Sequence, residues 1–286
     1  MPVLVPGTID EAVVALSRHP DSQLLAGGTD FMVEVNAGSR RPEAVVALDR
    51  IAELQDWTLA NGRLRLGAGV SYRQLMSPDL AALVPGLALA ARTVGSPQIR
   101  NAGTVGGNIG TASPAGDTLP VLVALDAVVE VASASGRRHV ALQEFIVGPK
   151  RTSLGPGEVI VAVEVPVLRG GQEYLKVGVR NAMVIAVASL ALIVDAEGRS
   201  VRCGLGSVGP VALRAPEAEA WLTSKVDWTS LRLPAGETSG AAQFAQFGRM
   251  VAAAAQPIDD HRSSADYRRH AVAVMAERAA ARLFGE

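Results

Sequence analysis

The sequence predicts an α+β fold, and three observations support it. The chain of 286 residues is 49% hydrophobic and 19% charged, which is the composition of a folded protein with a large core. Up to about residue 170, strand-like and helix-like segments alternate. Beyond it, three strand-like segments precede three helical ones, which indicates an antiparallel sheet covered by helices. We therefore expect domains at residues 1–56, 57–170 and 171–286.

Composition excludes several classes of protein. The 27 basic and 28 acidic residues give a net charge of −1 without a basic block, so we expect no nucleic-acid partner. The single cysteine, Cys203, excludes internal disulfides and an iron–sulfur cluster held by this chain alone. The four histidines show no ligand spacing, so we expect no metal site. The longest apolar run, residues 183–194, is too short to span a membrane, and no signal peptide is evident, so we expect a cytoplasmic protein.

The first domain begins with a helix. Thr8 and Glu11 form a capping box, and apolar residues continue the pattern to Leu16. Strands are expected at residues 23–26 and 45–48. A helical turn capped by Thr29 or Asp30 should follow the first of them, which is a geometry that binds phosphate in other proteins.

The second domain carries a strong hairpin signal. Asn-Gly at 61–62 separates two alternating segments, residues 57–60 and 63–66. The remaining predicted elements are a helix at 85–94, a hairpin pairing 128–131 with 139–142, and a strand at 158–165.

The third domain is predicted as a meander followed by helices. Strands are expected at 173–179, 185–195 and 200–205, and helices at 216–222, 239–255 and 264–284. In the last helix we expect a core stripe formed by Tyr267, Ala271, Val274, Met275, Arg278 and Leu283.

The segment Arg100–Asp117, which reads RNAGTVGGNIGTASPAGD, is the most informative part of the chain. It contains five glycines and almost no large side chains. Bare backbone of this kind suits close approach to an anion, because free N–H groups in tight turns form anion-binding nests. Ala26–Asp30, AGGTD, has the same character. Two such loops predict one ligand with a pyrophosphate between them, although Ala26–Asp30 alone also fits a tight connection without a ligand.

Two other patterns have simpler explanations. Residues 204–209 match G-x-G-x-x-G, but an extended segment follows, so we interpret them as a glycine-rich strand rather than a dinucleotide site. Asp259 and Asp260 resemble a metal pair, but Arg262 nearby favours a solvated turn or an ion pair.

Several motifs together resemble the FAD-binding subunits of the molybdenum hydroxylases. They are Ala-Gly-Gly-Thr-Asp at 26–30, Thr-Val-Gly-Gly-Asn at 104–108, and Ala-Ser-Pro-x-x-Asp at 112–117. Tyr174-Leu175-Lys176 with Arg180, and the segment 257–268, resemble the family's C-terminal domain. The resemblance covers nearly the whole chain, and the two glycine motifs in this order are highly specific together.

The resemblance implies two α/β subdomains of the PCMH-type, vanillyl-alcohol-oxidase-like FAD-binding fold, plus a C-terminal domain of antiparallel sheet with helices. It implies non-covalent FAD, with Asp117 contacting it, Ile160 packing on it and Lys176 beside the isoalloxazine, where a cation stabilises a reduced flavin. An exposed strand lysine is the simpler alternative for Lys176. No catalytic residue is expected in this chain. The implied FAD-binding residues are Leu24, Leu25, Ala26, Gly27, Gly28, Thr29, Asp30, Phe31, Val94, Thr104, Val105, Gly106, Gly107, Asn108, Thr111, Ser113, Asp117, Ile160 and Lys176.

The resemblance also implies partners. A small 2Fe–2S subunit would receive electrons from a large molybdopterin subunit and pass them to this flavin, in a dimer of heterotrimers; NAD+, oxygen or a quinone would then accept them. Thr29-Asp30, in place of His-Ser, favours the xanthine dehydrogenase type over the carbon monoxide dehydrogenase type. No aspartate stands near Val184, where many members have one. A free-standing flavoprotein oxidase and a flavin-free scaffold subunit remain the alternatives.

Overall fold

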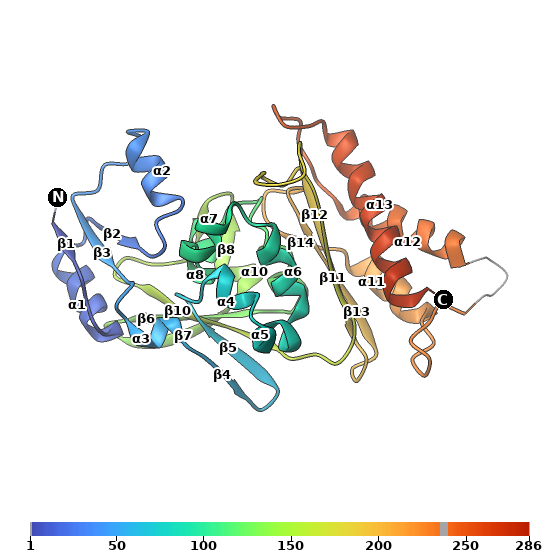
Figure 1. Ribbon diagram of the computed structural model, residues 1–286, viewed down its shortest axis with the longest axis horizontal. Helices are drawn as coiled ribbons and strands as arrows, with labels where there is room; N and C mark the ends of the chain where they lie inside the picture. The colour runs from blue at the N-terminus through green and yellow to red at the C-terminus, as the bar shows by residue number, and fades with distance from the viewer. Residues whose placement is uncertain (1, 235–239, 286) are drawn as a thin grey trace. The chain divides into compact units, whose positions relative to one another are not determined.

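The computed structural model describes residues 2–234 and 240–285, which form two compact units (Figure 1). The first unit contains residues 2–75, 96–112 and 126–166. The second contains residues 76–95, 113–125 and 167 onward. Both units combine helices and sheet, as the predicted α+β class requires. Each unit is assembled from separate stretches of chain, and the three predicted domain boundaries stay a prediction.

A small parallel sheet opens the first unit. Its strands lie in the order β1 (Val3–Leu4), β3 (Ala44–Ala47) and β2 (Ser22–Leu25), with helix α1 (Ile9–Arg18) between β1 and β2 in sequence. The capping box is confirmed, because the Glu11 N–H donates to Thr8 Oγ1 over 3.2 Å. The Glu11 carboxylate reaches back one residue further than in a standard capping box, because Oε2 accepts the N–H of Gly7, which precedes the N-cap, over 2.7 Å.

A five-stranded antiparallel sheet forms the larger part of the first unit. Its order is β4 (Trp57–Ala60), β5 (Arg63–Gly67), β10 (Val159–Pro166), β6 (Val128–Ser133) and β7 (Gly136–Ala141). Both predicted hairpins are present. Asn61 and Gly62 have φ of 52° and 72°, which is the left-handed geometry that a two-residue hairpin turn requires.

Short elements connect these sheets. They are α2 (Phe31–Asn36), α3 (Ala52–Gln55), α4 (Tyr72–Leu75), α7 (Pro97–Ala102), α8 (Val105–Thr111), α10 (Leu142–Phe145), and the hairpin of β8 (Ile146–Gly148) and β9 (Arg151–Thr152). Helix α8 and the last residues of α7 fall within the glycine-rich segment 100–117, for which the sequence predicts a loop. That expectation was wrong.

The second unit is built on a four-stranded antiparallel sheet. Its strands are β11 (Gln172–Val177), β12 (Ala188–Asp195), β13 (Ser200–Gly206) and β14 (Leu213–Arg214). One face packs against α11 (Pro216–Lys225), α12 (Gly240–Ala254) and α13 (Ala265–Phe284), where Phe247 and Phe284 are fully buried or nearly so. The remaining helices of this unit are α5 (Pro78–Leu83), α6 (Pro85–Thr93) and α9 (Leu119–Ala124).

The predicted core stripe of the last helix is right in part. In α13, Ala271 and Met275 are buried as expected, whereas Tyr267 is half exposed and Arg278 is exposed, and the stripe continues through Ala279. The helix expected from Ser239 is α12, which begins at Gly240; Ser239 lies outside the described residues.

The two simple interpretations are confirmed. Gly204 and Gly206 belong to β13, and the next element is strand β14, so no helix follows the glycine motif. A Cβ on Gly204 would lie 1.9 Å from the carbonyl oxygen of Pro120, so close packing explains this glycine. Asp260 Oδ1 accepts a hydrogen bond from Arg268 over 2.6 Å and is therefore an ion-pair partner. Within residues 2–234 and 240–285, no helix has the length and apolar character needed to cross a membrane.

Candidate functional site

The first unit contains a cavity of about 470 Å³, within the range typical of sites for small ligands. Three stretches of the unit contribute to its wall: residues 24–74, 101–111 and 150–160. Strand β2, helix α8 and strand β10 each bring one predicted site segment to it. The wall therefore gathers residues that are far apart in the sequence.

Residues 26–30 form the loop between β2 and α2. Gly28 has φ of +71°, a conformation that favours glycine. A Cβ on Gly27 would lie 1.7 Å from the carbonyl oxygen of Ala102, so only glycine fits there. Within the described part of the chain, the backbone N–H groups of Gly27, Gly28 and Thr29 donate no hydrogen bond, although these residues line the cavity. This loop has the free donors of an anion-binding nest.

Asp30 stands at the N-cap position of α2 but makes no capping bond with its side chain. Its Oδ2 instead accepts a hydrogen bond from Thr111 Oγ1 over 3.0 Å. This bond links the loop to the last turn of α8 and fixes one wall of the cavity. Asp30 is thus the N-cap residue that the sequence predicts, but its side chain does not make the capping hydrogen bond. Thr29 caps no helix in the described residues.

The second glycine motif begins helix α8 and does not form a nest. Thr104 is the N-cap, and its Oγ1 accepts the N–H of Gly107 over 3.0 Å. The N–H of Gly106 donates to the carbonyl oxygen of Ala68 over 2.8 Å. A Cβ on Gly106 would lie 2.4 Å from the Cβ of Ala68. These glycines therefore allow close packing of the backbone, and their N–H groups are already used.

Ile160 reaches the cavity from strand β10. The pairing of β10 with β6 shifts register between Ile160 and Ala162, which marks a β-bulge. Bulges change the direction of side chains at the end of a strand. The Cδ1 of Ile160 lies 3.5 Å from the Cβ position of Gly110, so this side chain forms an apolar part of the wall beside α8.

The structure brings most of the predicted site residues together. Those that line the cavity are Leu24, Ala26, Gly27, Gly28, Thr29, Asp30, Phe31, Thr104, Gly106, Gly107, Asn108, Thr111 and Ile160. Leu25 and Val105 belong to the same unit but do not line it. Val94, Ser113, Asp117 and Lys176 belong to the second unit. Sequence reasoning missed several lining residues, notably Gln55, Ala68, Tyr72 and the charged residues Glu34, Arg40 and Lys150.

In the second unit, Asp117 and Lys176 form a buried ion pair. Lys176 Nζ lies 2.7 Å from Asp117 Oδ2, and their side chains are 6% and 9% exposed. The Tyr174 hydroxyl donates to Asp117 Oδ1 over 2.9 Å, and Lys176 also donates to the carbonyl oxygen of Thr93. Burial raises the pKa of the Asp117 carboxyl, although Lys176 and Tyr174 act in the opposite direction. The alternative that Lys176 is an exposed strand lysine is wrong.

Comparison with known proteins decides the family. A family model described as "FAD binding domain in molybdopterin dehydrogenase" matches residues 1–168, and one described as "CO dehydrogenase flavoprotein C-terminal domain" matches residues 173–283. The chain belongs to the FAD-binding medium subunits of the molybdenum hydroxylases. It is accordingly a subunit of an oxidoreductase.

Individual relatives agree with this membership. The chain is 32% identical to the glyceraldehyde dehydrogenase medium chain of Sulfolobus acidocaldarius over 95% of this chain and 94% of the other. It is also 32% identical to a putative xanthine dehydrogenase FAD-binding subunit of Escherichia coli K12, over 74% of this chain and 75% of that one. A solved carbon monoxide dehydrogenase chain from Hydrogenophaga pseudoflava matches with a TM-score of 0.86 and 30% identity, over 97% of this chain and 95% of that one.

These matches do not separate the subtypes of this family. Xanthine dehydrogenase and carbon monoxide dehydrogenase chains match at similar identity. The preference for the xanthine type, which rests on Thr29-Asp30, stays a prediction.

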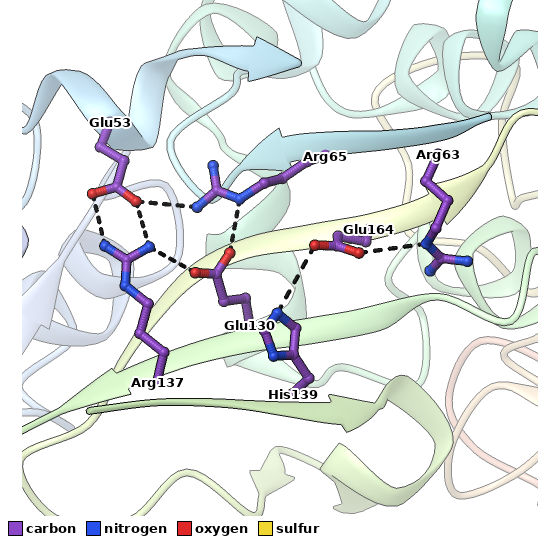
Figure 2. Close-up of polar contacts among 7 residues, drawn as sticks. All are labelled: Glu53, Arg63, Arg65, Glu130, Arg137, His139 and Glu164. Carbon is purple, nitrogen blue, oxygen red and sulfur yellow. Dashed lines mark hydrogen bonds and ion pairs between the residues drawn. The ribbon is translucent and has the colours of Figure 1, made fainter. Parts of the chain in front are cut away.

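One further polar cluster of this medium subunit lies on the five-stranded sheet (Figure 2). Side-chain atoms of Glu130, His139 and Glu164 lie within 4.8 Å of one another, a juxtaposition that the sequence did not reveal. Both carboxylates already have arginine partners. Glu130 accepts bonds from Arg65 and Arg137, and Glu164 pairs with Arg63 over 3.4 Å. The cluster is therefore a network of ion pairs across neighbouring strands.

Proposed function

We propose that this chain holds one FAD non-covalently in the cavity of the first unit and acts there as an electron-transfer subunit. The observation that carries the proposal is the set of free N–H groups at Gly27, Gly28 and Thr29, on a loop that faces the cavity. These half-buried N–H groups lie on consecutive residues, so they can donate together to one anionic acceptor. A diphosphate is such an acceptor and suits a backbone nest.

The other lining residues fit the same ligand. Gly27 allows its loop to pack against Ala102, and Gly106 allows α8 to pack against Ala68. The Asp30–Thr111 hydrogen bond then fixes the loop relative to α8. Ile160 offers apolar surface for a ring system. Bound FAD would supply the redox chemistry, so the chain needs only to bind and orient it and requires no acid, base or nucleophile of its own.

The resemblance extends the proposal to Val94, Ser113, Asp117 and Lys176. Lys176 is held in place by its ion pair with Asp117, and a positive charge near a flavin favours its reduced, anionic form. The support for this part comes from the family motif and from the chemistry of the pair.

The partners follow from the family. We propose that electrons reach this chain from a 2Fe–2S small subunit, which takes them from a molybdopterin large subunit, and that they leave to NAD+, oxygen or a quinone. A dimer of heterotrimers and a cytoplasmic location are part of the same proposal. The substrate that is oxidised would bind another chain.

The test is flavin content together with subunit composition. The purified protein should show flavin absorbance, release about one FAD per chain on denaturation, and recover it on reconstitution. A protein that contains no flavin and takes none up contradicts the proposal. A flavin-containing chain that oxidises a substrate without partners supports a free-standing flavoprotein instead.

A further inference from the structure

One carboxylate holds two cations at the wall of the cavity. Glu34 Oε2 lies 3.0 Å from Arg40 Nε, and Glu34 Oε1 lies 3.2 Å from Lys150 Nζ. All three residues line the cavity. Glu34 belongs to α2 and Lys150 to the turn between β8 and β9, so the bridge connects segments 116 residues apart in the sequence.

Both cations have fixed backbone positions. The N–H groups of Ser39 and Arg40 donate to the carbonyl oxygen of Glu34, which ends the helix and places Arg40 next to it. The N–H of Lys150 donates to the carbonyl oxygen of Ala112 over 2.9 Å, and Lys150 has φ of 55°. The backbone of each cation is therefore tied to an element that forms the cavity.

The side chain of Arg40 is further oriented by an aromatic ring. Its guanidinium carbon lies 5.1 Å from the centroid of Phe31, a distance that gives a cation–π interaction. Phe31 also lines the cavity. A guanidinium held by a ring on one side and a carboxylate on another is pre-organised to bind a second anion through its remaining N–H groups.

Three carboxylates and two cations line the cavity, and their pairing is uneven. Two positive charges share the single negative charge of Glu34. Asp30 and Asp49 also line the cavity, but within the described residues neither forms an ion pair with Arg40 or Lys150. The lining thus carries two cations and three carboxylates, and Arg40 keeps N–H groups beyond its bond to Glu34, in the same cavity as the backbone N–H groups of residues 27–29.

We infer that Arg40 and Lys150 bind the phosphate groups of the ligand, as side-chain partners of the backbone nest. This inference rests on the proposed function, because the phosphates are those of the dinucleotide. Arg40 would contribute hydrogen bonds of fixed direction, and the more exposed Lys150 mainly charge. Glu34 keeps both cations at the wall.

The experiment is a titration of flavin-free protein with FAD and with riboflavin, which has the same ring system but no phosphate. The variants are Arg40→Gln and Lys150→Gln. The neighbours Arg41 and Arg151 are exposed and do not line the cavity, so Arg41→Gln and Arg151→Gln are matched controls. We expect Arg40→Gln to weaken FAD about tenfold and Lys150→Gln roughly threefold, since a hydrogen bond to a charged group is involved in each.

Riboflavin affinity should not change in any variant, and the controls should match the wild type with both ligands. The wild type should also lose FAD affinity with added salt more steeply than Arg40→Gln does. Unchanged FAD affinity in both cavity variants, or an equal loss for riboflavin, overturns the inference. A wild-type protein that takes up no FAD contradicts the proposed function itself, so the two failures are distinguishable.

Discussion

In the cavity of the first unit, the polar groups that face inward include backbone N–H groups without partners, whereas in the second unit Asp117, Lys176 and Tyr174 satisfy one another. The cavity loop presents backbone donors that suit the acceptors of a ligand. The Asp117 cluster is complete as folded. Changes in the cavity loop should therefore alter ligand affinity, while changes in the cluster should mainly alter the stability of the fold.

Removing the cation of the cluster should give the largest effect. Lys176→Met leaves the Asp117 carboxylate buried without its ion-pair partner, so we expect a loss of about 3–5 kcal/mol in the free energy of unfolding at neutral pH. Denaturant unfolding measures it. The double variant Asp117→Asn with Lys176→Met should recover much of the loss. A single variant that loses less than about 1 kcal/mol would contradict a buried pair.

The same variant has a defined pH dependence. Burial already raises the pKa of Asp117 from 3.8, and loss of Lys176 removes an interaction that lowers it. A carboxyl whose pKa is higher in the folded state contributes most to stability below its unfolded pKa. That contribution to the free energy of unfolding is lost as the pH rises through the folded pKa. The destabilisation should therefore shrink as the solution is acidified. A loss of stability that stays constant across the acid range would show that the unpaired Asp117 carboxylate is not its cause.

Glycine packing should give the next largest effect, because one glycine of the cavity wall also contributes to the stability of the fold. Gly106→Ala forces a Cβ against Ala68, so we expect a loss of roughly 2–3 kcal/mol in stability, measured without FAD. Gly148→Ala is the control, because nothing lies within 4 Å of its Cβ position and its φ is not positive. Equal stability of the two variants would mean that the second glycine motif serves the ligand rather than packing.

Thr104 and Thr29, the threonines of the two glycine motifs, should differ in their effect on stability. Thr104→Ala removes the N-cap of α8 and should cost about 1 kcal/mol in stability. Thr29→Ala removes no capping bond in the described residues, so its stability should match the wild type. Thermal unfolding of both variants without flavin decides this. A destabilised Thr29→Ala variant would show that the Thr29 side chain supports the fold of its loop, as Thr104 supports α8.

The ion-pair network of Figure 2, in which Arg137 and Glu53 are partly exposed, should give the smallest effect. A hydrogen bond from Arg137 lowers the pKa of Glu53; burial raises the pKa of Glu130, but bonds from Arg65 and Arg137 outweigh it. Carboxyls with lowered pKa stabilise the fold above their unfolded value of 4.5 and lose this as the pH falls through the folded pKa. Arg137→Gln should therefore cost about 1 kcal/mol at neutral pH, after allowance for exposure, and nothing in strong acid. Arg41→Gln is its exposed control, and unfolding curves at several pH values measure both.

Much of the fold could be predicted, because local signals agreed with tertiary structure. The Thr8–Glu11 capping box and the Asn61-Gly62 turn each determine a local geometry almost alone. The first glycine loop was also found from its residues. Helix α8 was missed, since its glycines disfavour a helix and only packing against Ala68 and the cap at Thr104 stabilise one there.

Other features depend on distant contacts that spacing does not show. Arg268 is buried in α13 because it pairs with Asp260 and donates to two carbonyl oxygens, so the core face runs one position away from the predicted stripe. No sequence pattern singles out Arg40 or Lys150, and only the fold brings both to Glu34. The discontinuous composition of the units was equally invisible in the sequence.

That discontinuity has a consequence for the order of events during synthesis. The loop at residues 26–30 emerges from the ribosome early, yet Gly27 packs on Ala102, and the cavity wall is complete only with Ile160. At about 5–20 residues per second, several seconds separate the first wall from the last. A nascent chain shorter than about 160 residues can present the nest but cannot enclose a ligand, so cofactor capture has to wait for β10.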